Sequence, residues 1–229
     1  MRKLSLLMIT LLLVSLTAFA VQGEADDRRL TIVLDENPTT GYGWSYTPSA
    51  EGMLREVSSE YAQDPDSAGL MGAGGKRTWV FEGLMPGDVT LQFQYARPFE
   101  EGVDPVRSVS YFLRIGEDLQ PSLRGQVEAS GIFAFISLAE NPTTGYQWAI
   151  ELSAEGIMDQ DGDEYTPDTV PEGMTGAGGM HTWRFGTLAP GEVTLRFSLQ
   201  RSWEAGAEDA LSLTFAVDGN LNAALVSAE

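Results

Sequence analysis

The sequence predicts an all-β protein built from two tandem domains, and three observations support this: an internal repeat, an apolar period of two, and turn signals between the apolar segments. The octapeptide NPTTGYGW at residues 37–44 returns as NPTTGYQW at residues 141–148, an offset of 104 residues. The offset holds without a gap from Leu34 to Arg97 of the first copy. A period near 100 residues exceeds the ~20–50 residues of a solenoid unit, so the repeat indicates a duplicated domain.

Within each copy, apolar residues recur at every second position. The segment TLQFQY at residues 90–95 places Leu91, Phe93 and Tyr95 on one face, and TLRFSL at residues 194–199 repeats the pattern. Such alternation is typical of strands with one buried face. Pro-Gly pairs precede both segments and signal turns, because proline presets φ and glycine accepts a positive φ. Short strands and turns over about 100 residues predict an antiparallel β-sandwich of immunoglobulin-like kind.

The first twenty residues have the composition of a cleavable signal peptide. They begin with Arg2 and Lys3, continue with an apolar run and end with Ala-Phe-Ala at residues 18–20. The alternative is a membrane anchor, since the run approaches the ~18 residues that span a bilayer. The polar segment QGEADDRR that follows favours cleavage, after residue 20 or as late as 23. We therefore expect a secreted or periplasmic (extracytoplasmic) protein without membrane association after cleavage.

The remaining chain divides into two domains at a segment rich in turn signals. The stretch GEDLQPSLRGQ at residues 116–126 contains one proline and two glycines. The sequence therefore predicts a first domain at 24–117, a linker at 118–125 and a second domain at 126–229. Roughly 205 mature residues suffice for two domains of ~100 residues, each able to fold alone.

Composition excludes several classes of function. The formal net charge is −19, and −21 without the two leader cations, whereas nucleic acid requires a basic surface. The sequence contains no cysteine, so disulfides, a thiol nucleophile and zinc–thiolate sites are excluded. Its one histidine, His181, corresponds to Arg77 in the first copy and is expected to be a solvated strand residue. We expect no enzyme activity and no cofactor.

An acidic segment, DQDGDEY at residues 159–165, superficially suggests a calcium loop. It lacks the bidentate glutamate at position 12 of such a loop, and the first copy has REVSSEY instead. The sequence therefore predicts no metal site.

The repeated NPTTGY loop is more rigid than a simple turn requires. Pro38 restricts Asn37 to extended geometry, Thr39 and Thr40 are stiff at χ1, and Gly41 allows a sharp exit. A loop needed only for turning is usually served by Asn-Gly or Asp-Gly. The loop is nearly uncharged and carries hydroxyls, which indicates recognition rather than a purely structural turn. The four tryptophans at 44, 79, 148 and 183 lie in strand-like contexts and are expected in the cores.

Two further segments repeat with the loop. GAGG at residues 72–75 and 176–179 would let the backbone lie against another surface; a phosphate loop is disfavoured because no helix follows. Arg97-Pro98-Phe99 and Arg201-Ser202-Trp203 each offer a cation and an aromatic side chain after a strand. If the arginine and the aromatic side chain are exposed, the pair is typical of an interface hot spot. The alternative is that the aromatic side chain is buried in the core.

The order of these motifs, N-P-T-T-G-Y, then G-x-G-G, then R-x-aromatic, resembles the chagasin family of cysteine-protease inhibitors in both copies. The resemblance implies an immunoglobulin-like β-sandwich whose three loops occlude the cleft of a papain-like peptidase reversibly. The protease-binding residues that it implies in the first copy are Asn37, Pro38, Thr39, Thr40, Gly41, Tyr42, Gly72, Gly74, Gly75, Arg97, Pro98 and Phe99. In the second copy they are Asn141, Pro142, Thr143, Thr144, Gly145, Tyr146, Gly176, Gly178, Gly179, Arg201 and Trp203.

Each copy departs from the family pattern at one position. Phe99 stands where the family often has tryptophan, and Ser202 stands where it has proline, so either domain could be weakened. The partners expected are papain-like cysteine peptidases, bound by a monomer that has two sites if both domains are active. The alternative function is a non-inhibitory extracellular binding or adhesion module for carbohydrate or protein, because a fold does not fix a function.

Overall fold

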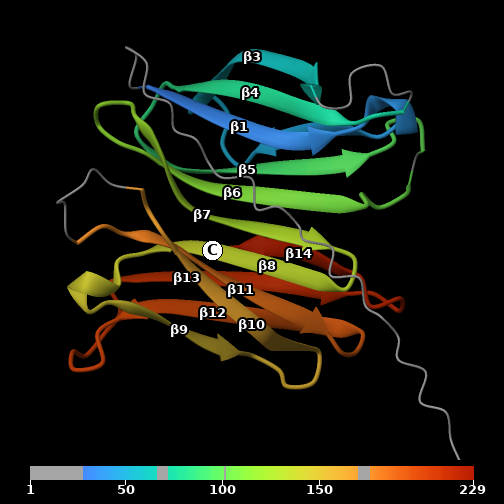
Figure 1. Ribbon diagram of the computed structural model, residues 1–229. Helices are drawn as coiled ribbons and strands as arrows, with labels where there is room; N and C mark the ends of the chain where they lie inside the picture. The colour runs from blue at the N-terminus through green and yellow to red at the C-terminus, as the bar shows by residue number, and fades with distance from the viewer. Residues whose placement is uncertain (1–27, 66–71, 101, 170–175) are drawn as a thin grey trace, which may run out of the picture.

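The computed structural model describes residues 28–65, 72–100, 102–169 and 176–229, and contains strands and short 3-10 turns but no α-helix over these ranges (Figure 1). This confirms the all-β prediction. The leader at 1–20, predicted to be a signal peptide, lies outside the described residues. Among the residues that are described, no helix is long and apolar enough to cross a membrane.

The strands alternate with tight connections along the chain, and the two halves follow the same order. The first half contains β1 (Arg29–Glu36), β2 (Gly43–Pro48), β3 (Leu54–Gln63), β4 (Gly75–Gly83), β5 (Gly87–Ala96), β6 (Arg107–Ile115) and β7 (Pro121–Ser130). The second half contains β8 (Phe133–Glu140), β9 (Gln147–Leu152), β10 (Met158–Pro167), β11 (Gly179–Thr187), β12 (Gly191–Gln200), β13 (Asp209–Val217) and β14 (Ala223–Ala228).

Each half is an antiparallel sandwich of two sheets. In the first half, the sheet β1-β4-β3 faces β2, β5, β6 and β7, and in the second half β8-β11-β10 faces β9-β12-β13-β14 (Figure 1). The alternating residues predicted from the sequence fill the space between the sheets: Leu91 and Phe93 in the first core, Leu195 and Phe197 in the second, are fully buried. Burying one face of every strand is what holds two small sheets together.

The four tryptophans expected in the cores divide into two pairs. Trp79 and Trp183 are buried in the cores, as the sequence predicts. Trp44 and Trp148 are only partly buried against the cores, and each indole N–H donates to a backbone carbonyl of the preceding strand, 2.9 Å to Asp35 and 3.1 Å to Ala139. This bond satisfies the indole N–H at the edge of the sandwich.

The two halves are joined by a strand rather than by an irregular linker. Residues 121–125 of the expected linker lie within β7, which pairs with β6 of the first half and β8 of the second. The result is one continuous seven-stranded sheet in the order β10-β11-β8-β7-β6-β5-β2. The chain turns at residues 131–132, between β7 and β8, so the structural division between the halves falls there.

A β-bulge allows β7 to face both cores. In its register with β6, Leu113 pairs with Leu123 and Phe112 pairs with Gly125, so Arg124 is the extra residue. One inserted residue shifts the alternation of side chains to the opposite face. Leu123 accordingly packs against the first core, whereas Val127, an even number of positions further on, is buried in the second.

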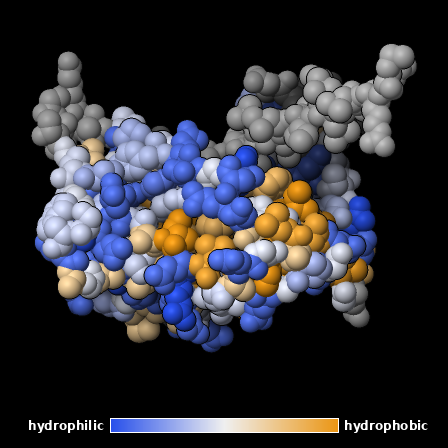
Figure 2. Space-filling view, turned by 90° about the horizontal axis from the view of Figure 1, so that it is seen from below, coloured by the Kyte–Doolittle hydropathy of each residue, from blue (hydrophilic) through white to orange (hydrophobic). Residues whose placement is uncertain are grey.

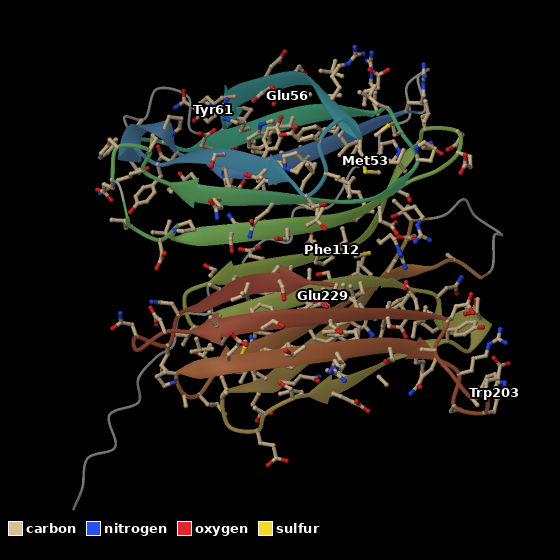
Figure 3. The ribbon with its side chains drawn as sticks, turned by 180° about the vertical axis from the view of Figure 1, so that it is seen from behind. Met53, Glu56, Tyr61, Phe112, Trp203 and Glu229 are labelled. Carbon is tan, nitrogen blue, oxygen red and sulfur yellow. The ribbon has the colours of Figure 1, made fainter. Side chains whose placement is uncertain are left out.

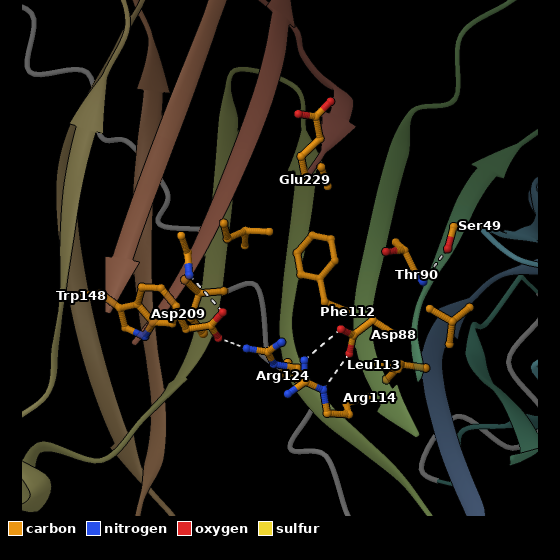
Figure 4. Close-up of a pocket in the computed structure, with 15 residues that line it drawn as sticks. Ser49, Asp88, Thr90, Phe112, Leu113, Arg114, Arg124, Trp148, Asp209 and Glu229 are labelled. Atoms are coloured by element: carbon orange, nitrogen blue, oxygen red, sulfur yellow. Dashed lines mark hydrogen bonds and ion pairs between the residues drawn. The ribbon is translucent and has the colours of Figure 1, made fainter. Parts of the chain in front are cut away.

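Polar contacts and a groove mark the junction between the halves. Arg124 of β7 forms an ion pair with Asp209 at the start of β13, and Phe112 packs against the second core. A groove of about 390 Å³ lies between the halves, and the ion pair of Arg114 with Asp88 borders it (Figure 4). The face seen from below carries a group of hydrophobic residues surrounded by hydrophilic ones (Figure 2).

The structure changes one expectation for the acidic second half and places its acidic segment in a strand. His181 is not a solvated strand residue: Nδ1 lies 2.6 Å from Glu140, Nε2 lies 2.9 Å from Asp163, and the ring stacks on Trp183 at 4.1 Å between centroids. The acidic segment 159–165 lies in strand β10, with Asp161 paired to Arg184. The described residues hold no cluster of potential metal ligands.

Candidate functional site

Residues 37–42 form an exposed turn between β1 and β2, here called the first tip loop; residues 141–146, between β8 and β9, form the second. In the first, Pro38–Thr40 make one turn of 3-10 helix, and Pro38 occupies the start of the turn, where no N–H is needed. Gly41 ends the turn with a φ of 79°, a left-handed conformation that disfavours other residues. Gly145 does the same with a φ of 81°.

The asparagine before each turn holds the tip loop rigid. Asn37 Oδ1 accepts hydrogen bonds from the backbone N–H of Thr39 at 3.2 Å and from its hydroxyl at 2.6 Å. The Thr40 hydroxyl donates to the carbonyl oxygen of Asn37 at 2.7 Å. The second tip loop repeats all three bonds at the same distances. Both threonines of each loop are exposed, so the bonds fix side chains that solvent or a partner can reach.

The glycine-rich segment lies beside the tip loop and is tied to it. The side-chain amide of Asn37 donates to the carbonyl oxygen of Gly72 at 2.8 Å, and Asn141 donates to Gly176 at 2.9 Å. Gly72 is exposed and has a φ of 82°, which glycine tolerates without strain. This pair of bonds fixes the spacing between the first two loops of each copy.

The last glycine of each segment has a different place from the one expected. Gly75 and Gly179 are buried as the first residues of β4 and β11. A Cβ on Gly75 would overlap the backbone carbonyl oxygen of Ala62 on the neighbouring strand. These two glycines therefore permit close strand packing beneath the loops and do not present a surface, whereas Gly74 and Gly178 are half-buried.

The aromatic side chains of the third segment are exposed rather than buried in the core. Phe99 is 69% exposed and Trp203 is 68% exposed, and the latter projects at the end of the second half (Figure 3). A Cβ placed on Gly41 would lie 3.4 Å from the Phe99 ring, so this loop flanks the tip loop directly. On Gly145 the corresponding distance to Trp203 is 2.5 Å, which shows closer packing in the second copy.

The arginine of this segment connects it to the tip loop. The Arg97 guanidinium lies 4.4 Å from the ring centroid of Tyr42, and that of Arg201 lies 4.2 Å from Tyr146. Each also pairs with the glutamate three residues later, which raises the pKa of both arginines. These glutamates, Glu100 and Glu204, are not among the site residues predicted from the sequence, although their recurrence at the same offset was a signal for them.

The two copies fix the tip by different additional bonds. In the first, the backbone N–H of Asn37 donates to the hydroxyl of Tyr95 at 3.1 Å. The second has Leu199 in place of Tyr95; there, Arg201 Nε donates to the carbonyl oxygen of Thr144 at 3.1 Å. The Nε of Arg97 is buried without a hydrogen-bond partner among the described residues. The predicted residues of each copy thus converge at one end of its sandwich, with the second tip held by its own arginine.

A buried carboxylate with a side-chain partner lies beneath each tip loop. Glu36, which precedes the first tip loop, is buried and pairs with Arg77 of β4. Glu140, in the same position of the second copy, is buried and bonds to His181. A buried carboxylate requires such a partner, so these pairs fix the strand end from which the tip loop departs.

Comparison with known proteins agrees with the repeat. The model of a family described as "Chagasin family peptidase inhibitor I42" matches residues 26–113 and again 131–217. Two similar proteins of Entamoeba histolytica are Amoebiasin-2, 35% identical over 83 residues, and Amoebiasin-1, 38% identical over 68 residues. These matches cover 36% and 30% of this chain, and 66% and 64% of the relatives, so the chain spans just under two thirds of their length.

Two solved structures are also similar to one half of the chain. The crystal structure of the cysteine protease inhibitor EhICP2 from Entamoeba histolytica is 28% identical, with a TM-score of 0.36 over 38% of this chain and 78% of that one. The solution structure of Amebosin is 27% identical, with a TM-score of 0.30 over 37% of this chain and 78% of that one. With both halves matched by one family model, this chain belongs to the chagasin family of peptidase inhibitors, and it carries two family domains in tandem.

Proposed function

We propose that this protein inhibits papain-like cysteine peptidases reversibly, by covering the active-site cleft with the three loops at one end of each domain. The observation that carries the proposal is the tip loop, which is built twice with the same exposed threonines and the same internal hydrogen bonds. The family consists of inhibitors rather than enzymes.

The geometry suits inhibition by occlusion. A loop already fixed by its own hydrogen bonds loses little conformational freedom on binding, so more of the contact energy appears as affinity. In each tip, Gly41 or Gly145 brings the chain back sharply, so that two exposed threonines project from a narrow turn. The exposed Phe99 or Trp203 and the neighbouring arginine would contact one wall of the cleft, and the glycine-rich segment the other.

The same proposal implies an extracytoplasmic place of action. The basic and apolar leader at residues 1–20, ending in Ala-Phe-Ala, is what supports export of the chain. A chain without cysteine needs no oxidative folding step, so its stability after export rests on the two cores.

Titration of the mature protein against papain tests the proposal. The parent protein is expected to reduce papain activity reversibly, with activity recovered on dilution and no cleavage of the inhibitor. Changing Thr40 and Thr144 together to arginine places a bulky charge in a closed cleft and is expected to raise the inhibition constant by about 100-fold or more. Full papain activity at micromolar parent protein would overturn the proposal.

A matched control variant distinguishes the effect of arginine in the tip loops from the effect of added positive charge elsewhere on the surface. Thr47 and Glu151 occupy equivalent exposed positions on β2 and β9, away from the tips. Thr47→Arg with Glu151→Arg adds even more positive charge than the tip variant and is expected to leave the inhibition constant within about twofold.

A second experiment distinguishes inhibition from binding elsewhere on the peptidase. Papain whose active site has been blocked by a covalent inhibitor should not be captured by the protein; equal capture of blocked and free papain would favour a non-inhibitory binding module.

A further inference from the structure

The two tip loops lie at opposite ends of the molecule. The first tip loop leads from the end of β1 into the start of β2, which lies at the same end of the sheet as the start of β6, with β5 between them. The second tip loop follows the last residue of β8. Strand β7 is antiparallel to both β6 and β8, so β6 and β8 run in the same direction. Because one tip lies where β6 begins and the other where β8 ends, the shared sheet directs them to opposite sides.

Figure 1 shows the same arrangement. The blue turn after β1 lies at the right of the upper sandwich, and the yellow turn after β8 lies at the left of the lower one. In the reverse view of Figure 3, Trp203 is at the right end and Tyr61, whose hydroxyl lies beside Gly75, is at the left end.

The register of the shared sheet gives the spacing between the two sites. Ser108, next to the start of β6, aligns through Ala129 with Ala134, next to the start of β8. The sites are therefore separated by nearly the full length of β8, which at ~3.3 Å per residue is about 26 Å along the strands, and each loop extends beyond its strand end. Two peptidases would approach along opposite directions and would not compete for the same space.

The junction is built to hold this geometry. Backbone pairing of β7 on both edges replaces the free rotation of an ordinary linker. Val127 is buried in the second core, and Arg124 pairs with Asp209 across the junction. The N–H of Ala223 at the start of β14 also donates to the carbonyl oxygen of Gly131, at 2.9 Å, in the turn after β7.

We infer that one molecule of this protein binds two papain-like peptidases at once, one at each end, with the seven-stranded sheet as a fixed spacer. This inference rests on the proposed function, since it requires each tip loop to engage a peptidase. The two sites act independently: occupation of one end does not change the affinity of the other, because no loop is shared between them. The product is a linear assembly of peptidase, inhibitor and peptidase.

The stoichiometry of the complex with papain tests the inference. The mature protein is mixed with increasing active papain, and the mass of the complex is measured by light scattering during size-exclusion chromatography. The parent is expected to saturate at two papain molecules per inhibitor. Thr40→Arg, which blocks the first end, and Thr144→Arg, which blocks the second, are each expected to saturate at one, and Thr47→Arg should still saturate at two.

The outcomes distinguish this inference from the proposed function. Saturation of the parent at one papain, with both single variants still binding one, would mean that the ends exclude each other. Saturation at one, with one single variant losing all binding, would mean that one end is inactive. Either result overturns simultaneous binding and leaves inhibition intact. The absence of any complex with the parent would instead overturn the proposed function itself.

Discussion

The side-chain amide of Asn37 donates a 2.8 Å hydrogen bond to the carbonyl oxygen of Gly72, while its Oδ1 accepts from the N–H of Thr39. One side chain thus closes the tip loop and ties it to the glycine-rich segment. Asn141 makes the same bonds to Gly176 and Thr143 in the second domain. This asparagine, together with the strand pairing beneath it, therefore sets the position of the tip loop relative to the glycine-rich segment in each domain.

Substituting this asparagine should separate the two roles. Asn37→Ala removes all three side-chain hydrogen bonds, two from Thr39 and one to Gly72, and is expected to lower the free energy of unfolding by about 1 kcal/mol. Asn37→Asp keeps an acceptor for Thr39 but loses the donor to Gly72, so stability should fall less than in the alanine variant while inhibition still weakens. Both are made in the Thr144→Arg background, so that only the first site is measured. If Asn37→Asp and the Thr144→Arg background had equal inhibition constants, the hydrogen bond to Gly72 would make no contribution to inhibition.

The two tip glycines should respond differently to alanine. Gly41 and Gly145 both have a positive φ, so either substitution costs about 1 kcal/mol through the backbone alone. An added Cβ lies 3.4 Å from Phe99 in the first domain but 2.5 Å from Trp203 in the second. Gly145→Ala is therefore expected to displace Trp203 and weaken its site more than Gly41→Ala weakens the other.

Tryptophan fluorescence provides the readout for this displacement. Gly145→Ala should shift the emission of the exposed Trp203, and the shift should be lost in a Gly145→Ala, Trp203→Phe double variant. Gly41→Ala serves as the control with the same backbone cost. Identical losses of affinity at the two ends would contradict the packing difference.

Ending the first domain before β7, at residue 117, or after it, at residue 130, should give fragments of very different thermal stability. A fragment of residues 28–117 lacks β7, leaving the β6 edge unpaired and the Leu123 contact with the first core missing. A fragment of residues 28–130 retains both and is expected to fold with a cooperative thermal transition. The shorter fragment should unfold at a markedly lower temperature, because it lacks the β6–β7 pairing and the Leu123 contact with the core. Equal melting temperatures would show that β7 does not stabilise the first domain.

Alkaline pH should weaken the first domain through Tyr46. Burial, with the hydrogen bond to Glu56 at 2.7 Å, raises the pKa of this phenol to about 12 from its ordinary value of 10.0. A raised pKa means that the stabilisation is complete below about pH 10 and is lost as the pH rises through about 12. Tyr46→Phe should therefore cost about 1 kcal/mol at neutral pH and progressively less between pH 10 and 12.

Urea unfolding at pH 7, 10 and 11.5 measures this difference. Comparing parent with variant cancels the contribution of Tyr111, whose pKa is also raised, chiefly by burial. The second domain has Ile150 at the equivalent position and provides an internal control. A stability difference that stays constant from pH 7 to 11.5 would show that the phenol does not carry the pH dependence.

Local sequence signals were sufficient to predict the strands and the rigid tip loops. Alternation placed Leu91 and Phe93 in the first core because the side-chain period of a strand follows directly from its backbone geometry. The rigidity of the tip was also local: the proline, the threonine hydroxyls and the glycine act within a few residues of Asn37. For the same reason, the rigidity of the two tip loops could be predicted without the fold, whereas the pattern alone left open whether Phe99 and Trp203 are exposed or buried.

The tertiary structure alone decided the junction between the domains and the placement of the two sites. Pro121 and Gly125 signalled a linker, but Pro121 is the first residue of β7, and Gly125 makes room for the side chain of Leu138 on β8. From the local sequence alone, a proline or glycine in a linker cannot be distinguished from one in a strand. Edge-to-edge strand pairing, and the bulge at Arg124 that turns β7 toward two cores, depend on residues distant in the sequence, so only the folded chain directs the two tips to opposite ends.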